Sequence, residues 1–354
     1  MKALITAGGK GTRLRPITHT QNKHLIPVAN KKILDYALEY VKEAGITDIG
    51  IITNKEGTEV KEVYGDGSDF GVDITYIPQE SPRGLADCIR IAEPFIGKEP
   101  FVFYLGDNII VGGINRFVQE YKQNQTSCHL VLSKVPDPGR FGVPEIEDDR
   151  IVKVIEKPDD PPSDFAVTGI YIYDSSIFEA VNNIEPSERG ELEISDAHQY
   201  LIDNDLEISF SEITGWWKDT GKPNDLIEAN RLVLDNINRD LRGELDSESI
   251  IQGRVKVEEG AEVESSHLRG PVTIGKNAKI KNSYIGPYTS INQNSTIRNS
   301  EVEFSIIMQN VSICDQKMRI ENSIFGKNSE ILRSDNKPGA NNFIIGENSQ
   351  ISIR

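Results

Sequence analysis

A six-residue hydrophobic repeat in the last third of the chain constrains the fold more than any other sequence feature. Apolar residues recur six positions apart in sets of three, and each set begins 17 residues after the previous one. In parallel β-helices one hexad forms one side of a triangular coil, so the repeat predicts a hexapeptide β-helix. Stacked coils bury one another's inward side chains, so several coils are needed for stability. The first three sets are Ile251, Val257, Val263; Leu268, Ile274, Ile280; and Ile285, Ile291, Ile297.

The repeat loosens toward the C-terminus. Val302 begins a fourth set, 17 residues after Ile285. Less regular pairs follow at Ile307 and Ile313, Phe325 and Ile331, and Ile345 and Ile351. Residues 334–339 (Ser-Asp-Asn-Lys-Pro-Gly) are expected to form a loop that interrupts a coil. The part from residue 241 holds 17 Ile, 4 Leu and 12 Asn, a mixture that favours strands and turns over helices. A β-sandwich is the alternative interpretation.

Charge divides the chain at the same place. From residue 241 onward there are 14 Lys or Arg and 14 Asp or Glu, so this part is neutral. The whole chain has 39 Lys or Arg against 55 Asp or Glu and a formal charge of −16, so the acidic excess lies before residue 241. At roughly 150 residues per domain, 354 residues allow two domains. We predict domains at 1–240 and 241–354.

The N-terminal part shows a different pattern, in which strand-like and helical segments alternate. Apolar residues within 33–41 are spaced along one face of a helix, and 223–236 is predicted as a helix that leads toward the second domain. Such alternation predicts an α/β fold with a Rossmann-like, mostly parallel mixed sheet. In such sheets ligands bind beyond the carboxyl ends of the strands. The predicted strands are 3–6, 48–52, 74–77, 101–105, 127–134, 151–156 and 167–173.

Several classes of protein are disfavoured. The acidic balance argues against a nucleic-acid partner. No run of about 18 apolar residues occurs, and Met1 leads directly into a strand, so we expect no membrane association and a cytoplasmic location. Three scattered cysteines, Cys88, Cys128 and Cys314, support neither a disulfide framework nor a zinc ribbon, and are expected to be buried reduced thiols.

A glycine-rich loop after the first strand is suited to phosphate. Gly8, Gly9 and Gly11 permit close backbone approach, and their amides can form an anion nest. The loop lacks the Gly-Lys-Ser/Thr of a P-loop, and Leu14 stands where a dinucleotide fingerprint needs its third glycine. Neither a kinase nor a dehydrogenase is therefore favoured. Nearby cations supply charge for phosphate binding: Lys10, Arg13, Arg15 and Lys23.

Charged residues follow two of the predicted strands. Asp107 comes after the apolar strand 101–105, and Glu156-Lys157 closes the apolar strand at 151–155. Because ligands bind beyond the carboxyl ends of parallel strands, we expect Asp107 to be a metal ligand. Taken alone, Asp107 could equally cap a turn, and Lys157 could be a solvated surface lysine.

Together with further motifs in the same order, the loop at residues 8–16 and the segment 23–28 resemble the sugar-nucleotide pyrophosphorylases. Within that family the similarity is greatest to thymidylyltransferases that act on glucose 1-phosphate. The hexad repeat resembles the left-handed β-helix of the longer members, so the resemblance covers nearly the whole chain. The further motifs lie at 79–86 (Gln-Glu-Ser-Pro-Arg-Gly-Leu-Ala), 105–108, 141–143, 156–158, 167–169, 189–196 and 216–221.

The resemblance implies a reaction in which dTTP and α-D-glucose 1-phosphate give dTDP-glucose and pyrophosphate. The sugar phosphate attacks the α-phosphorus in line, and its oxygen is already an anion, so no general base is needed. His24 is therefore expected to be structural. Mg²⁺ is the implied cofactor, with Asp107 and Asp219 as its ligands.

The resemblance also implies a role for each remaining site residue. Arg13 and Lys23 would neutralise the triphosphate, and Lys157 would hold the sugar phosphate. The sugar would contact Gly142, Glu156 and Val167. The nucleotide would contact Gly8, Gly9, Gly11, Thr12, Gln79 and Gly84, with Gln79 offering a donor and an acceptor to a pyrimidine edge.

Alternatives remain open at this point. Phe141 stands where many thymidylyltransferases have Tyr, and Lys222 stands where Thr is common. An alternative function is therefore a uridylyltransferase that uses UTP with glucose or N-acetylglucosamine 1-phosphate. A bifunctional enzyme with a C-terminal acetyltransferase would need a base such as His267. A non-catalytic regulatory homologue is the third alternative function.

Because β-helices commonly pack side by side, we also expect a homo-oligomer through the C-terminal domain.

Overall fold

The computed structural model describes residues 1–333 and divides into two compact units. The first unit comprises Met1–Lys10, Asn22–Leu25 and Ile33–Asp219. The second comprises Gly11–Gln21, Ile26–Lys32 and the chain from Thr220 onward. The two short N-terminal segments and residues 220–240 group with the chain after residue 240. The domain boundary after residue 240 therefore stays a prediction.

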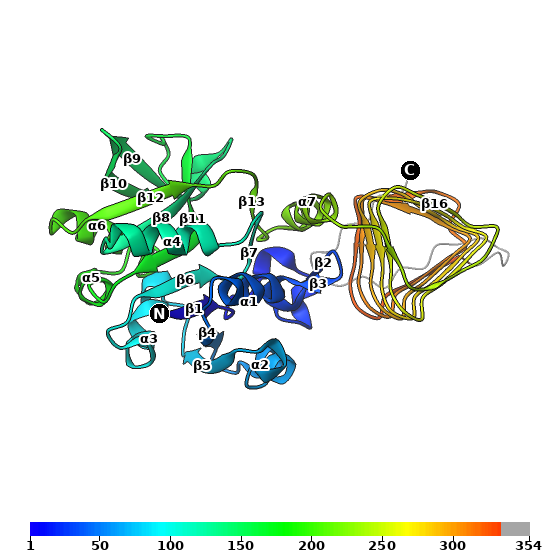
Figure 1. Ribbon diagram of the computed structural model, residues 1–354, viewed down its shortest axis with the longest axis horizontal. Coiled ribbons are helices and arrows are strands. Elements are labelled where there is room, and N and C mark those ends of the chain that lie inside the picture. The colour runs from blue at the N-terminus through cyan, green and yellow to red at the C-terminus, as the bar shows by residue number, and fades with distance from the viewer. Residues whose placement is uncertain (334–354) are drawn as a thin grey trace. The chain divides into compact units, whose positions relative to one another are not determined.

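A seven-stranded sheet forms the centre of the first unit, in the order β12-β8-β11-β6-β1-β4-β5 (Figure 1). All neighbouring strands are parallel except that β11 runs antiparallel to both β6 and β8. The predicted mostly parallel mixed sheet is confirmed. Its strands are β1 (Lys2–Thr6), β4 (Asp48–Asn54), β5 (Asp73–Gln79), β6 (Phe101–Leu105), β8 (Cys128–Lys134), β11 (Phe165–Tyr173) and β12 (Ile208–Glu212).

Hydrophobic clusters cover both faces of this sheet, because successive strand side chains point to opposite sides. In β1, Ala3 and Ile5 join one cluster and Leu4 joins the other. The first cluster includes residues of α1 (Ile33–Glu43), α2 (Thr58–Tyr64) and α4 (Asn115–Asn124). The second includes residues of α3 (Leu85–Ile96), α5 (Ile177–Asn183) and α6 (Ile194–Asp203). The face of α1 expected at 33–41 is buried as predicted.

Short paired strands lie outside the main sheet. Strand β7 (Asn108–Ile110) pairs antiparallel with β13 (Trp217–Asp219). Strand β9 (Gly142–Glu147) pairs with β10 (Arg150–Glu156), so the strand expected at 151–156 belongs to a hairpin and not to the central sheet. In the second unit, β2 (Pro27–Val28) pairs with β3 (Lys31–Lys32), and helix α7 spans Pro223–Leu234.

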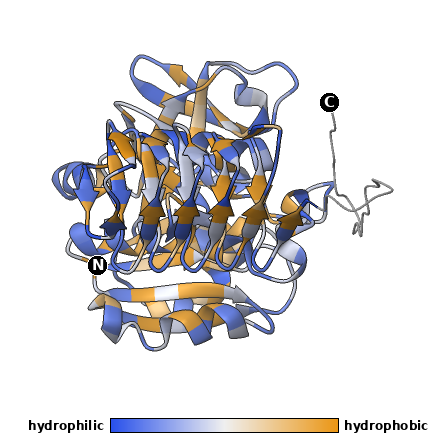
Figure 2. Ribbon diagram, turned by 90° about the vertical axis from the view of Figure 1, so that its right-hand side faces the viewer, coloured by the Kyte–Doolittle hydropathy of each residue, from blue (hydrophilic) through white to orange (hydrophobic). Residues whose placement is uncertain are grey.

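Three parallel sheets form a triangular coil in the second unit, which fits the predicted left-handed β-helix (Figures 1 and 2). The first sheet holds β14 (Asp240–Leu241), β17 (Val255–Val257), β20 (Val272–Ile274), β23 (Thr289–Ile291), β26 (Ile306–Ile307) and β29 (Ile324–Phe325). The second holds β15 (Glu244–Leu245), β18 (Glu262–Glu264), β21 (Lys279–Lys281), β24 (Thr296–Arg298), β27 (Ser312–Cys314) and β30 (Glu330–Leu332). The third holds β16 (Ile250–Gln252), β19 (His267–Arg269), β22 (Tyr284–Ile285), β25 (Glu301–Glu303) and β28 (Ile320–Glu321).

The hexad residues stack in register through the coil. On one sheet Val263 pairs with Ile280, which pairs with Ile297, and each is at most 1 % exposed. Asparagines occupy left-handed corners between strands, which explains why this part is rich in Asn. The corner residues Asn277, Asn294, Asn310 and Asn328 all have φ between 57° and 60°. The hexads expected at Ile345 and Ile351 and the loop at 334–339 lie outside the described residues.

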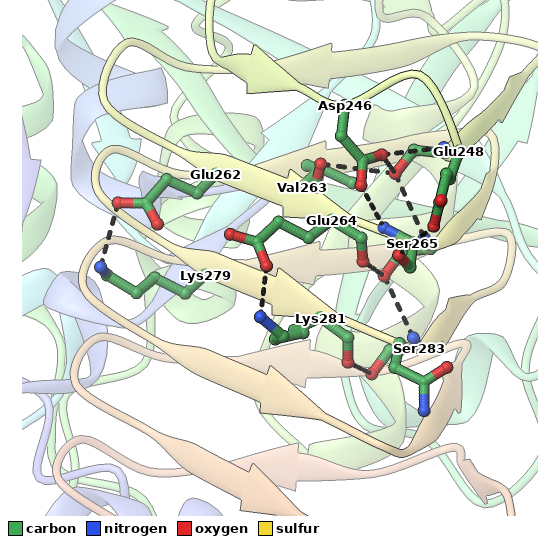
Figure 3. A network of polar contacts seen from close by, with 12 residues as sticks. Asp246, Glu248, Glu262, Val263, Glu264, Ser265, Lys279, Lys281 and Ser283 are labelled. Atoms are coloured by element: carbon green, nitrogen blue, oxygen red, sulfur yellow. Dashed lines mark hydrogen bonds and ion pairs between the residues drawn. The ribbon is translucent and has the colours of Figure 1, made fainter.

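Two outward Glu–Lys pairs join the neighbouring strands β18 and β21 of the second sheet (Figure 3). The Lys279 ammonium lies 3.0 Å from Glu262, and Lys281 pairs with Glu264 at 2.5 Å. The three cysteines are free and buried, as expected. Among the residues that the structure describes, no helix is long and apolar enough to cross a membrane.

Candidate active site

A lysine and an aspartate that are 84 residues apart meet at the carboxyl end of strand β6. Asp107 follows β6, and Lys23 opens the short 3₁₀ helix Lys23–Leu25. The Lys23 ammonium donates to Oδ2 of Asp107, while Asn108 Nδ2 lies 3.0 Å from Oδ1. Each side chain of the ion pair is 15 % exposed. The pair is therefore shielded from bulk water but reachable by a ligand.

The environment keeps Asp107 ionised. Burial alone would raise its pKa, but the Lys23 charge outweighs it and lowers the pKa to about 2. Burial first, and then Lys23, lowers the pKa of His24 to about 3. The His24 Nδ1 atom lies 2.8 Å from Asn22 Oδ1, and Asn22 also donates to the Ala7 carbonyl at 2.9 Å. His24 thus has the contacts of the structural residue that we expected.

Three glycines allow this convergence. A Cβ atom at Gly106 would lie 2.3 Å from the Thr6 carbonyl oxygen, and one at Gly9 would lie 2.9 Å from Lys23 Cε. A Cβ atom at Gly8 would lie 2.9 Å from the Asn54 backbone nitrogen. Contacts that short do not occur in native proteins without displacement of the neighbour. The glycine loop therefore lets Lys23 and the first strands approach closely.

The pairing of β7 with β13 brings the second expected metal ligand to the same place. Asp219 is the direct partner of Asn108, the residue after Asp107. The Trp217 indole donates to Asn108 Oδ1 at 2.6 Å, which fixes the two strands together. Phe141 packs edge-on against Trp217 at 5.2 Å between ring centroids. Asp219 therefore lies opposite the residue that follows Asp107, although the two aspartates are 112 residues apart in the sequence.

This pair of carboxylates fits a hard cation. Mg²⁺ is usually held by one or two carboxylates together with phosphate oxygens and waters. No group of three or more His, Cys, Asp or Glu that could hold a metal occurs among the described residues. A closed all-protein metal cage is therefore absent from this part of the chain, whereas a two-carboxylate site completed by a phosphate ligand remains compatible with it.

The residues expected to bind the sugar gather where the β9–β10 hairpin meets α6. Glu156 is the register partner of Gly142, and a Cβ atom at Gly142 would lie 2.8 Å from Ser195 Oγ. Ser195 donates to Glu156 Oε2 at 2.8 Å. Val167 is buried, and its Cβ lies 3.8 Å from that same Cβ position. These four residues therefore form one closely packed cluster around the Glu156 carboxylate.

Lys157 lies beside this cluster and contacts Glu156. It has a left-handed φ of 44°, and its backbone N–H donates to the Phe141 carbonyl at 2.9 Å. Its ammonium donates to Glu156 Oε1 at 2.6 Å. The left-handed turn thus places the Lys157 side chain against the carboxylate of the preceding residue, Glu156.

Arg189 is a charged residue beside Glu156 for which the sequence indicated no role. Its guanidinium lies 2.8 Å from Glu193 and 3.5 Å from Glu156. Both carboxylates line a groove of about 470 Å³ between β10 and α6, together with Lys153, Asp196 and Gln199. The motif at 189–196 contained this residue, but only the fold places it beside Glu156.

The residues expected at the nucleotide base surround the start of α3. Gln79 ends β5, and its Nε2 donates to Asp87 at 2.8 Å and to the Gly84 carbonyl at 3.3 Å. Gly84 has a φ of 101°, and a Cβ atom there would lie 2.4 Å from the Leu192 carbonyl oxygen. Only glycine fits this position. The segment before α3 is thus packed tightly on the segment that carries Arg189.

The remaining expected residues, Gly11, Thr12 and Arg13, belong to the second unit. Gly11 has a left-handed φ of 60° and precedes the 3₁₀ helix Thr12–Leu14, in which Thr12 and Arg13 are exposed. They do not belong to the compact unit that holds Asp107 and Glu156. His267, the base considered for acetyl transfer, lies on the third sheet of the coil with Nε2 3.2 Å from Gln252 Oε1.

Comparison with known proteins gives a consistent result. Residues 2–236 match the nucleotidyl transferase family. Over all 354 residues the chain is 46 % identical to a glucose-1-phosphate thymidylyltransferase of Streptomyces griseus, covering 99 % of it. A solved structure described as a glucose-1-phosphate thymidylyltransferase from Bacillus anthracis is 41 % identical and has a TM-score of 0.63. The match covers 68 % of this chain and 97 % of that one. A UDP-glucose pyrophosphorylase solved with UDP-glucose is 27 % identical, with a TM-score of 0.60 over 66 % of this chain and 98 % of its own.

Proposed function

The chain belongs to the nucleotidyl transferase family, and from this premise we propose that it is a glucose-1-phosphate thymidylyltransferase. It converts dTTP and α-D-glucose 1-phosphate to dTDP-glucose and pyrophosphate. A phosphate oxygen of the sugar phosphate bonds to the α-phosphorus as the bond to the leaving pyrophosphate breaks. The observation that carries the proposal is the meeting of Lys23, Asp107 and the β13 end that bears Asp219 at the carboxyl edge of the sheet.

The reaction requires the protein to supply positive charge, because two polyanions must approach each other. Lys23 and Arg13 neutralise the triphosphate. Asp107 and Asp219 hold Mg²⁺, which when bound offsets charge on the phosphate oxygens. The Lys23 ammonium, now on Asp107, turns to the phosphate oxygens when substrate arrives.

The sugar phosphate binds at the cluster formed by Gly142, Glu156 and Val167. Glu156 accepts hydrogen bonds from sugar hydroxyls through the oxygens that now accept from Ser195 and Lys157. Lys157 binds the phosphate of the sugar. Its present contact with Glu156 is exposed and therefore weak enough to be exchanged for a phosphate contact.

The pyrimidine base binds near Gln79 and Gly84, and the glycine loop (Gly8, Gly9, Gly11 and Thr12) holds the phosphates. Both hydrogen bonds of Gln79 use its Nε2 atom, which leaves Oε1 to accept from the N3–H of thymine or uracil. That contact is the same for both bases. Selection of dTTP over UTP therefore depends on the thymine methyl and the ribose 2′ position, and each small contact of this kind is worth about 1 to 3 kcal/mol.

We further propose that the protein is a homo-oligomer that assembles through the β-helix and functions in the cytoplasm. The neutral composition of the coil supports assembly, because it carries no excess of like charge. Acetyl transfer by His267 and a non-catalytic regulatory role are the competing functions.

The test is pyrophosphate release with Mg²⁺ across a grid of substrates. The nucleotides are dTTP, UTP, ATP, CTP and GTP, and the sugars are glucose, N-acetylglucosamine and mannose 1-phosphates. The expected result is the fastest turnover with dTTP and glucose 1-phosphate. A preference for UTP or for the amino sugar would keep the reaction and change the substrate. Nucleotide binding without turnover anywhere in the grid would instead indicate a regulatory homologue.

A further inference from the structure

The short segment that carries Lys23 is held at both ends by chain that packs with the coil. Asn22–Leu25 belongs to the first unit, whereas Gly11–Gln21 before it and Ile26–Lys32 after it belong to the second. Only two peptide links separate Gln21 from Lys23, a span of at most about 7 Å. A shift of Gln21 therefore displaces Lys23 through the chain itself.

The anchor after Lys23 is a two-residue hairpin turn. Strands β2 and β3 are joined by Ala29 and Asn30, which both have a left-handed φ, of 49° and 67°. Turns with two left-handed residues suit tight hairpins. The Asn30 Nδ2 atom donates to the Ile291 carbonyl of the coil at 2.8 Å and lies 3.4 Å from Thr273 Oγ1. The turn is thus hydrogen-bonded to two neighbouring strands of the coil.

A second asparagine fastens the same turn. Asn230 of α7 is 1 % exposed, and its Oδ1 accepts from the Ala29 backbone N–H at 2.8 Å. Its Nδ2 donates to the Tyr288 carbonyl of the coil at 3.0 Å. Because this amide is buried and uses both its donor and its acceptor, breaking either bond leaves a buried polar group unsatisfied.

The anchor before Lys23 is Gln21, which is 7 % exposed. Its Nε2 lies 3.5 Å from the sulfur of Met308, a fully buried residue of the coil. Within the described residues its Oε1 has no hydrogen-bond partner. A buried glutamine held by one weak acceptor contributes little to stability, so its contact with the coil points to a positional role for the segment that follows it.

We propose that the coil positions Lys23, with Gln21 and the Ala29–Asn30 turn as the two positioning contacts. The inference rests on the proposed function, in which Lys23 acts on the triphosphate. Displacement of a reacting group by about 1 Å can cost up to about a hundredfold in rate. The β-helix is then part of the catalytic apparatus through the segment it holds, and Asn30, Asn230, Gln21 and Met308 are positioning residues.

The test compares asparagines that have the same backbone conformation. Asn30→Gly removes the amide but keeps a residue that tolerates φ of 67°. Asn294→Gly is the matched control, because Asn294 has φ of 59° on the same coil. Among residues 1–333 it bonds only to the corner residues Asn277 and Asn310 and to the Lys276 carbonyl. Met308→Leu is a second, nearly isosteric variant that removes the sulfur acceptor of Gln21.

Two readouts are measured on the full chain: steady-state kinetics with dTTP and glucose 1-phosphate, and hydrogen–deuterium exchange of peptides covering residues 21–26. Asn30→Gly is expected to lower kcat at least tenfold while KM for the sugar phosphate stays within twofold. It is also expected to speed exchange in the 21–26 peptides. Met308→Leu should speed exchange there with a smaller loss of kcat, and Asn294→Gly should change neither.

The outcomes separate the two proposals. Unchanged kcat and exchange in both Asn30→Gly and Met308→Leu would overturn the positioning role, as would equal effects in Asn294→Gly. If the unaltered protein shows no turnover with any substrate pair, the proposed function fails. Hydrogen–deuterium exchange of the 21–26 peptides in Asn30→Gly and Met308→Leu then still tests whether the coil holds the Lys23 segment.

Discussion

The side chain of Lys23 reaches Asp107 only because single residues leave room for it. Glycines at positions 9 and 106 admit the lysine stem and the Thr6 carbonyl where any Cβ would collide. Asn22 ties the same turn to the end of β1 through the Ala7 carbonyl. At the residue scale, therefore, the site depends on small residues as much as on charged ones.

Replacement of either proposed metal ligand should abolish most of the activity. Asp107→Asn and Asp219→Asn each remove a negative oxygen and are expected to lower turnover at least a hundredfold, about 3 kcal/mol of transition-state stabilisation. Initial rates with dTTP and glucose 1-phosphate measure the effect, and tryptophan fluorescence checks the fold. The exposed Asp73 supplies the control, as Asp73→Asn. Near-normal rates in both site variants would refute the metal assignment.

A buried histidine should make the first unit sensitive to acid. Burial lowers the pKa of His198 from 6.5 to about 3, and its Nε2 lies 2.7 Å from the Tyr173 hydroxyl. The unfolded chain therefore binds the proton first as the pH falls. Stability is fully present above about pH 6.5 and is lost progressively toward pH 3.

The variant His198→Gln keeps a partner for Tyr173 and removes the titrating group. From pH 7.5 to 5.5 the native protein should lose about 1.4 kcal/mol of unfolding free energy relative to the variant. Urea titrations followed by fluorescence measure this, because both tryptophans, Trp216 and Trp217, lie in the first unit. Parallel pH dependence in the two proteins would show that His198 does not titrate in this way.

The elements of the coil are each too short to be stable alone. Strands of two or three residues gain stability only by stacking, since each coil covers the inward residues of the next. Outside the stack, opposite charges face each other between strands, as in Glu262–Lys279 and Glu264–Lys281 (Figure 3). Such cross-strand pairs support the observed register, because a one-residue shift would turn these charged side chains toward the coil interior.

Truncation of one inward residue should therefore destabilise the coil strongly. Ile297 is fully buried between Ile280 and Ile313, so Ile297→Ala is expected to cost about 2 to 5 kcal/mol. Ile250 is 53 % exposed, and Ile250→Ala should stay within about 0.5 kcal/mol. Hydrogen exchange of the coil peptides in increasing urea measures both. Equal losses in the two variants would contradict the stacking account.

Across the whole molecule, charge and repeat divide the chain into an acidic α/β part and a neutral β-helix. The neutral coil is the part proposed to assemble, because packing copies of it side by side adds no net repulsion. Sedimentation velocity at micromolar concentration is expected to give a species larger than 39.5 kDa. A single boundary at the monomer mass would rule out the proposed homo-oligomer.

The sequence by itself determined the features that depend on local periodicity and local chemistry. Alternating strand and helix patterns predicted the mixed sheet, the hexads predicted the coil, and the glycine loop predicted a phosphate site. These signals are readable because side-chain spacing fixes which face of an element is buried. Lys23 and Asp107 were indicated by their places near the glycine loop and after a strand, whereas Asp219 came from the resemblance alone. The roles of all three remain predictions about function.

Only the tertiary structure decided which distant residues meet. Nothing in the local sequence indicates that β13 pairs with β7, that Arg189 lies beside Glu156, or that the strand at Arg150–Glu156 joins a hairpin. The same holds for Asn30, whose amide bonds to a coil strand 261 residues later in the sequence. Such contacts depend on how whole elements pack, and the residues that make them are too far apart in the chain to leave a periodic signal.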